Sequence, residues 1–304
     1  MTDDQRFDST DPAVTELEVE SAGKPASLWS DAWKELRTSP IFIVSALLII
    51  VFIVMAIAPS LFTGADPLAC NLRNSLETPS AEHWFGFDVQ GCDYVARTVY
   101  GARVSISIGL IVTVFAVLIA LVLGSLAGYY GGILDTIIAR ITDIWFAIPT
   151  ILGGIVVLSL LQERGLWQVS LVLVLLGWPT MLRLLRSAVL SAREQDYIDA
   201  ARALGASDFR IIVRHILPNA IAPVIVYATI TVGVIISAEA ALSFLGVGLQ
   251  LPAVSWGLMI SGSQTRILQY PHLLLFPGVF LSMTVFSFIL MGDALRDALD
   301  PKLR

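Results

Sequence analysis

Charged residues, and lysine above all, are scarce in this chain of 304 residues. Only 14% of the residues are charged, and the lysines are Lys24, Lys34 and Lys302, whereas about a quarter of a soluble globular domain is charged. The motif G-x-x-x-x-G-K-S/T is absent, so the chain has no P-loop for binding a nucleotide. No block of basic residues occurs either, and we therefore expect no binding to nucleic acid.

The motifs of membrane-embedded enzymes are also missing. The sequence contains neither H-E-x-x-H nor G-x-S-x-G, and no carboxylates are paired within its apolar segments. It shows no convincing internal repeat, although repeats are common in ion-coupled carriers. These absences favour a protein that is not itself an enzyme.

Long apolar stretches make up most of the sequence. Hydrophobic residues are 56% of the total, and a membrane-spanning helix needs about twenty of them in a row. The stretches that meet or approach this length are 41–62, 104–129, 144–161, 167–182, 216–238 and 273–292. Because backbone groups in lipid must be paired within the segment, each should be a helix. The sequence predicts an all-α polytopic membrane protein with about six spans.

Residues 240–265 form a further uncharged segment. Its glycines and proline (Gly246, Gly248, Pro252, Gly257, Gly262) would interrupt a helix that faces lipid. We therefore expect an interfacial or re-entrant segment there and not a seventh span.

The N-terminal segment differs in composition from the rest. Acidic residues gather in it (Asp3, Asp4, Asp8, Asp11, Glu16, Glu18, Glu20) and apolar residues are few. We expect residues 1–38 to be a mostly disordered tail and residues 39–304 to be the transmembrane domain. An acidic start is unlike a signal peptide, so the first apolar stretch should remain as an anchor.

The distribution of cationic residues predicts the orientation. Of 19 Lys and Arg residues, those on one side of the predicted spans are Arg73, Arg97, Arg103, Arg164 and Arg266. Since Lys and Arg concentrate on the cytoplasmic side, both termini should be cytoplasmic. Residues 63–103 then form an extracytoplasmic loop and residues 191–218 a cytoplasmic one.

Both cysteines, Cys70 and Cys92, lie in the predicted outer loop. We favour a disulfide, which the chain-entropy account makes worth roughly 3 kcal/mol. The alternative is two unrelated thiols. A zinc site is not expected, because only His83 is nearby and no ligand spacing is present.

The predicted cytoplasmic loop is polar yet periodic. Apolar residues recur at helical spacing on both sides of Gly205, where a helix C-cap or a sharp turn is expected. The pattern predicts a helix, a turn and a second helix. Its small residues would let another backbone approach closely. The alternative is an amphipathic hairpin lying on lipid headgroups.

This loop resembles the EAA motif of permeases from binding-protein-dependent, ATP-driven importers. Asp199-Ala200-Ala201, Gly205 and Leu217-Pro218 fall on the positions of that motif. Asp199 replaces the usual Glu, and His215 stands where Ile is general. Further segments resemble the C-type subunit of dipeptide and oligopeptide permeases, namely 83–86, 100–103, 128–132, 240–246 and 255–257.

The resemblance implies a permease subunit of the bacterial inner membrane, surrounded by lipid, that forms half of a path for peptides. Its coupling helix would dock on an ATPase through Asp199, Ala200, Ala201, Gly205, Ala206 and Phe209. The implied partners are a second permease, two ATPase subunits or one two-domain ATPase, and an extracytoplasmic substrate-binding protein. ATP and Mg²⁺ would bind to the ATPase, and this chain would hold no cofactor. Importers of nickel chelates, glutathione or opines are alternatives, and an ion-coupled carrier is the alternative of another class.

Three further residues are candidates for the pathway or a gate. Glu239 is the only charged residue between Arg214 and Arg266, and an acid at that depth is costly unless it faces protein or water. It could instead be paired structurally at the end of a helix. Trp256 and His272 could line an outer vestibule, although Trp at that level is more often an interface anchor.

Overall fold

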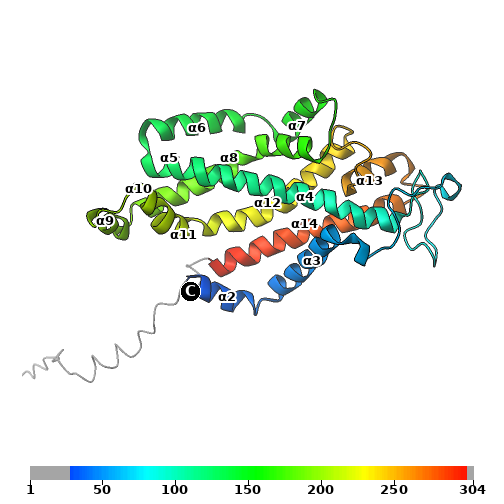
Figure 1. The fold of residues 1–304 in the computed structure, drawn as a ribbon, viewed down its shortest axis with the longest axis horizontal. Coiled ribbons are helices and arrows are strands. Elements are labelled where there is room, and N and C mark those ends of the chain that lie inside the picture. The colour runs from blue at the N-terminus through cyan, green and yellow to red at the C-terminus, as the bar shows by residue number, and fades with distance from the viewer. Residues whose placement is uncertain (1–27, 300–304) are drawn as a thin grey trace, which may run out of the picture.

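Long apolar helices, joined by short elements at both ends, make up the described part of the chain. The structure is a computed structural model that describes residues 28–299, and Figure 1 shows an elongated bundle. Within that range no strand forms. Isolated β-bridges pair Cys70 with Cys92 and Phe87 with Asp93.

Five helical stretches are long and apolar enough to cross a membrane. They are α3 (Pro40–Ile57), the run Tyr94–Tyr130 made of α4 (Tyr94–Ile119), η3 (Ala120–Gly124) and α5 (Ser125–Tyr130), α8 (Leu166–Arg193), α12 (Ala222–Phe244) and α14 (His272–Leu299). They correspond to five of the six predicted spans. Three of them, 94–130, 166–193 and 272–299, extend at both ends beyond the apolar stretch that predicted them. Asp93, for example, accepts a hydrogen bond from the backbone N–H of Ala96 and starts α4 ten residues early.

The span predicted at 144–161 is not one continuous helix. Two helices occupy this region, α6 (Gly132–Phe146) and α7 (Thr150–Ser159), and they are bent by 80° at the break. Pro149 lies in the break, and a proline disfavours helical conformation in the residue before it. In Figure 1 the pair runs from the end of the bundle where α5 finishes to the end where α8 begins. Counted as one broken span, it brings the total to six.

Shorter elements connect the long helices. They are η1 (Pro59–Leu61), η2 (Leu72–Asn74), α9 (Asp196–Ala203), α10 (Asp208–Arg210), η4 (Ile211–Ile216), α11 (Leu217–Ala220), α13 (Trp256–Ser263) and η5 (Gln264–Arg266). Segment 240–265, for which we expected an interfacial or re-entrant structure, contains the end of α12, a loop and α13. None of these is long enough to be counted as a further span.

Helix α12 packs against several of the long helices, contacting α14, α4 and α8, and also against α13. Small residues allow these contacts to be close. A Cβ placed on Gly233 would lie 3.0 Å from the carbonyl oxygen of Val285 in α14. Close packing at glycine is the usual basis of helix association in lipid, where no hydrophobic force drives helices together.

The described chain begins with a helix, α2 (Leu28–Leu36), which packs on α14. Ala32 and Leu36 are buried there, together with Ala294 and Ala298. The segment 1–38, predicted to be a mostly disordered tail, therefore contains a helix at 28–36, whose apolar face packs on α14. Residues 1–27 of that prediction lie outside the described part.

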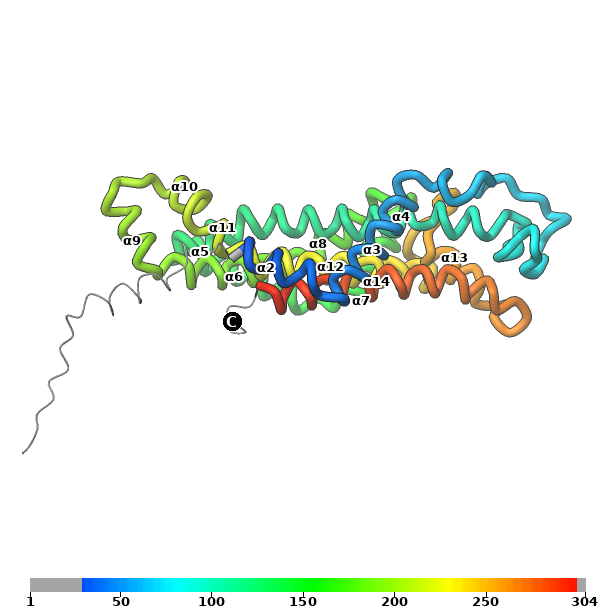
Figure 2. Tube along the Cα trace, turned by 90° about the horizontal axis from the view of Figure 1, so that it is seen from below, coloured from blue at the N-terminus to red at the C-terminus, as the bar shows by residue number. Residues whose placement is uncertain are grey.

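The segments that connect the long helices lie at the two opposite ends of the molecule. Figures 1 and 2 both place α9 and α10 at one end of the long axis and the 63–93 loop with α13 at the other. Helix α2 and the C-terminal end of α14 lie toward the α9 end. The structure thus groups both ends of the described chain with the helix–turn–helix segment.

The bend between α6 and α7 is tied to a kink in α8. Pro179 lies inside α8 and has no N–H, so the carbonyl of Leu175 loses its normal helical partner. The indole Nε1 of Trp145, near the end of α6, donates to that carbonyl at 2.5 Å. In lipid no water could take this role. The side chain therefore both satisfies the carbonyl and fixes the bend against α8.

We predict that Trp145→Phe, which keeps an aromatic ring but removes the donor, lowers the free energy of unfolding by about 1–2 kcal/mol. The measurement is SDS-induced unfolding of the purified chain in mixed micelles. Trp167→Phe is the matched control, because Trp167 is 68% exposed and its indole has no hydrogen-bond partner among the residues that the structure describes. Equal losses in the two variants would contradict the assignment.

Candidate functional site

The turn between α9 and α10 is closed by a complete helix C-cap motif. Gly205 has a φ of +77°, a conformation that favours glycine. The N–H of Ala206 donates to the carbonyl of Ala201 at 3.1 Å, and the N–H of Gly205 donates to that of Arg202 at 2.9 Å. These two bonds define a Schellman motif. The chain therefore reverses sharply and places residues 204–209 at the end of the molecule.

Two large apolar side chains flank this turn and are exposed. Leu204 is 88% exposed and Phe209 is 76% exposed. No atom lies within 4 Å of a Cβ placed on Gly205, so the backbone between them is open to an approaching partner. We call Leu204, Gly205 and Phe209 the apolar tip. Exposed apolar groups that cluster at one end of a molecule indicate a contact surface.

The other predicted coupling residues divide between the surface and the interior. Asp199 and Ala200 are exposed on α9, and Ala206 is half-buried. Ala201 is buried in the chain's own core, near Ile198. Ala201 therefore holds α9 to the bundle, and the contact with a partner expected of both alanines stays a prediction. Leu204 was not predicted as a coupling residue. Its spacing continues the apolar pattern of α9 and suggested a buried position, whereas it lies just beyond the end of the helix and is exposed.

Polar contacts fasten the α9–α10 segment to the end of α5. The hydroxyl of Tyr129 donates to Asp208 Oδ1 at 2.7 Å, and Arg193 Nη1 donates to the carbonyl of Tyr129 at 3.0 Å. The guanidinium of Arg202 lies 5.7 Å from the centre of the Tyr129 ring. The segment is thus joined to both neighbouring spans and does not hang freely from them.

A nearly continuous helical path leads from the apolar tip into the bundle. Helix α10 runs into the π-helix η4 and then α11, and only Ile221 separates α11 from α12. Ile211 and Ile216 of η4 are fully buried against the bundle. A force applied at the tip would therefore reach α12 through helix, which is stiffer than a loop.

Glu239 of α12 is fully buried near the opposite end of the bundle. Its Oε1 accepts hydrogen bonds from the hydroxyls of Ser243, at 2.8 Å, and Ser255, at 3.1 Å. Its Oε2 has no hydrogen-bond partner among the described residues. Since Ser255 caps α13 by accepting from the N–H of Leu258, the carboxyl group joins α12 to the start of α13.

Trp256 and His272 are also inside the chain. Trp256 is fully buried, and its Nε1 donates to the carbonyl of Thr98 at 2.9 Å. His272 is 7% exposed and lies edge-on to Tyr94 and Tyr270. The close packing of α13 on α4 encloses the ring of Trp256, so this side chain is not the exposed interface anchor that was one of the expectations for it.

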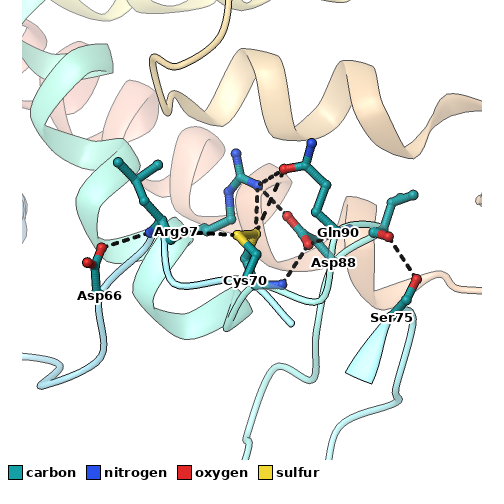
Figure 3. The surroundings of a disulfide bond; sticks show 9 residues. Asp66, Cys70, Ser75, Asp88, Gln90 and Arg97 are labelled. Carbon is teal, nitrogen blue, oxygen red and sulfur yellow. Dashed lines mark hydrogen bonds and ion pairs between the residues drawn. A yellow bond between two sulfur atoms is a disulfide. The ribbon is translucent and has the colours of Figure 1, made fainter. Parts of the chain in front are cut away.

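The structure joins Cys70 and Cys92 in a disulfide with a sequence separation of 22. Figure 3 shows Asp88, Gln90 and Arg97 gathered around it. Arg97 forms an ion pair with Asp88, and its Nη1 lies 3.4 Å from the sulfur of Cys92. Asp88 Oδ1 also accepts from the backbone N–H groups of Gln90 and Cys92, at 2.8 and 2.9 Å. The disulfide therefore holds a buried ion pair at the start of α4.

Comparison with known proteins identifies the family. Residues 120–304 match the family described as "Binding-protein-dependent transport system inner membrane component". The chain belongs to this family. Residues 27–79 of this permease also match the N-terminal TM domain of oligopeptide transport permease C. It is therefore a multi-pass inner-membrane permease of an ABC importer.

Relatives of the permease match it over nearly their whole length. The oligopeptide transport system permease protein OppC of Bacillus subtilis is 41% identical over 281 residues, which cover 92% of each chain. The dipeptide permease protein DppC of Alkalihalophilus pseudofirmus is 43% identical over 278 residues, covering 91% of each. The glutathione permease protein GsiD of Escherichia coli is 38% identical over 284 residues, also 91% of each.

A solved structure shares the fold. A chain of the MetNI methionine ABC transporter, in an inward-facing conformation, matches the permease with a TM-score of 0.56. The match covers 67% of this chain and 96% of that one, at 22% identity. At that identity the likeness bears on the fold alone.

We predict that Glu239→Leu destabilises the permease by about 1–3 kcal/mol, because Ser243 and Ser255 lose their common acceptor. Glu239→Gln keeps an oxygen at this position and should lose less. SDS-induced unfolding measures both. Glu163→Leu is the control, since Glu163 is exposed. If Glu239→Leu unfolds like the unaltered chain, the carboxyl group does not hold α13.

Proposed function

We propose that this permease forms half of the translocation pathway for di- and oligopeptides in an ATP-driven importer. The relatives support the proposal. OppC is named as an oligopeptide permease protein and DppC as a dipeptide permease protein, and both match over at least 91% of the chain. A peptide has polar groups that hydrocarbon cannot solvate. It therefore needs a water-filled path that opens alternately to each side.

The remaining components of the importer would be separate chains. A second, homologous permease supplies the other half of the path, since one set of about six helices rarely encloses a water-filled channel. Two ATPase subunits, or one two-domain ATPase, bind ATP and Mg²⁺ and perform the catalysis. An extracytoplasmic binding protein delivers the peptide. This chain is non-catalytic and binds no cofactor in this arrangement.

The apolar tip is the observation that supports coupling. Leu204 and Phe209 are exposed on either side of Gly205, at the end of a segment fastened to α5 and continuous with α12. A cleft on an ATPase would bury both side chains and let its backbone approach Gly205. Movement of that cleft during ATP hydrolysis would then shift α12 and the helices packed on it.

We predict that Leu204→Ser combined with Phe209→Ser reduces ATP-driven peptide uptake at least about tenfold, because two buried apolar contacts are worth roughly 3 kcal/mol or more. Gly205→Trp should act similarly, through backbone strain and bulk. Membrane insertion and expression should not change, since the described chain does not bury these side chains. Uptake of a labelled peptide by vesicles containing the importer is the measurement.

Leu268→Ser serves as the control for the tip variants. Leu268 is 96% exposed but lies between η5 and α14, at the opposite end of the bundle. Loss of an exposed leucine there should leave uptake unchanged. Normal uptake by the double tip variant, or equal loss with Leu268→Ser, would rule out docking at the tip.

The proposed orientation places the apolar tip in the cytoplasm and the disulfide loop outside. We predict that Ala200→Cys is protected from a membrane-impermeant maleimide in intact spheroplasts, whereas Leu268→Cys reacts. Both positions are exposed, and the two native cysteines are joined in a disulfide. Labelling of Ala200→Cys from outside would reverse the orientation. Reaction of both variants after permeabilisation is the control for accessibility.

Glutathione is a second candidate cargo, because GsiD relatives are 38% identical over 91% of the chain. Glutathione is itself a tripeptide, so the same path would suit it chemically. Competition distinguishes the two cargoes: excess glutathione should leave dipeptide uptake unchanged if dipeptides are the cargo.

A further inference from the structure

A pocket of about 390 Å³ lies beside the disulfide, at the end of the bundle opposite the apolar tip. The start of α4 and residues 88–90 form one wall, and residues 251–266 form the other. The lining combines apolar side chains with polar and charged ones, the charged ones being Asp88, Arg97 and Arg266. Pockets of this size and composition are typical of small-ligand sites.

The charges on the pocket wall do not cancel. Asp88 is neutralised by its ion pair with Arg97 and by two backbone N–H donors. Arg266 also lines the pocket, and no carboxylate of the described residues pairs with it; its Nη1 lies 3.3 Å from the hydroxyl of Thr265. The pocket therefore carries one cation in excess and favours a ligand with a negative charge.

A second polar group at this site lacks a partner. Arg97 is 9% exposed, and its Nε is buried with no hydrogen-bond partner among the described residues. The bonds found for its guanidinium use Nη1, which contacts Asp88, Gln90 Oε1 and the sulfur of Cys92. Figure 3 shows these partners on the disulfide side of the guanidinium. Arg97 thus leaves one buried donor, its Nε, without a partner inside the pocket wall.

The apolar part of the lining comes from the other wall. Leu251, Leu258 and Met259 contribute to it, and Leu251 is 64% exposed. These side chains would take a hydrocarbon group out of water, while Arg266 would take an anionic group. The ligand that fits both is a carboxylate attached to an apolar residue.

We propose that this pocket binds the carboxylate and apolar side chain of a peptide's C-terminal residue, at the outer end of the permease. The proposal rests on the proposed function, in which peptides arrive at this end. Arg266 provides the charge that attracts the carboxylate, and Leu251, Leu258 and Met259 surround the side chain. The disulfide keeps residues 88–92 and Arg97 in place to complete the wall.

The test uses the full-length chain in lipid nanodiscs with N-acetyl-L-leucyl-L-leucine as the probe. Acetylation removes the ammonium group, so the carboxylate is the only charge on the probe. The amide of the same compound is the matched neutral ligand. We expect the acid to bind roughly tenfold more tightly than the amide by calorimetric titration, as a charge-assisted hydrogen bond would give. Equal affinities would overturn the proposal.

Variants separate the charge from the apolar contact. Arg266→Gln should lower the affinity for the acid to that for the amide and leave the amide unaffected. Leu251→Ser should weaken both. Arg73→Gln is the control, because Arg73 is an exposed cation of the 63–93 loop, at the same end of the molecule, that does not line the pocket. Loss of acid binding in Arg73→Gln as well would show general electrostatic attraction and would reject the site.

The outcome is independent of the coupling experiment. If the probe does not bind but peptide uptake depends on ATP and on the apolar tip, the pocket proposal alone is lost. If the probe binds as expected and uptake needs no ATPase, the pocket remains and the proposed transport mechanism is wrong.

Discussion

Every backbone carbonyl and N–H group inside a bilayer must find its partner within the protein, because hydrocarbon offers none. The architecture of this permease follows from that constraint. Helices run almost without interruption. At η3 and η4 the helical hydrogen-bond pattern changes from α to π, and the helix continues through both turns without a break. Where proline does remove a hydrogen bond, at Pro179, the indole of Trp145 replaces it. The α6–α7 bend is thereby held at one place on α8.

The same continuity connects the two ends of the molecule. At one end the apolar tip projects beyond the helices, yet Tyr129 and Arg193 hold its base to the spans. At the other end Glu239 joins α12 to α13 through Ser255, and α13 forms part of the pocket wall. Helix α12 contacts both regions. A displacement produced at the tip therefore has a direct helical route to the segment that lines the outer pocket.

Much of the fold could be predicted, because the apolar runs are long and their meaning in lipid is simple. The wrong predictions concern places where one residue, or a contact with a distant helix, had more effect on the structure than the average composition of the segment. Pro149 divides segment 144–161 into two helices, although the mean hydropathy of that segment is high enough for one membrane span. Residues 28–36 were taken as tail, since their apolar face acquires a meaning only when α14 is beside it. The directions of Ala201 and Leu204 depend on how α9 lies on the bundle.

By itself, the sequence determined the membrane environment, the approximate number of spans, the helix–turn–helix segment around Gly205 and the resemblance to peptide permeases. These features depend on composition and on the spacing of residues within a few helical turns. Only the tertiary structure decided that Trp256 and His272 are buried, that Leu204 is exposed at the tip, and that Arg97 and Arg266 share a pocket. Those facts depend on contacts between residues far apart in the chain, and local patterns carry no information about which distant segments pack together.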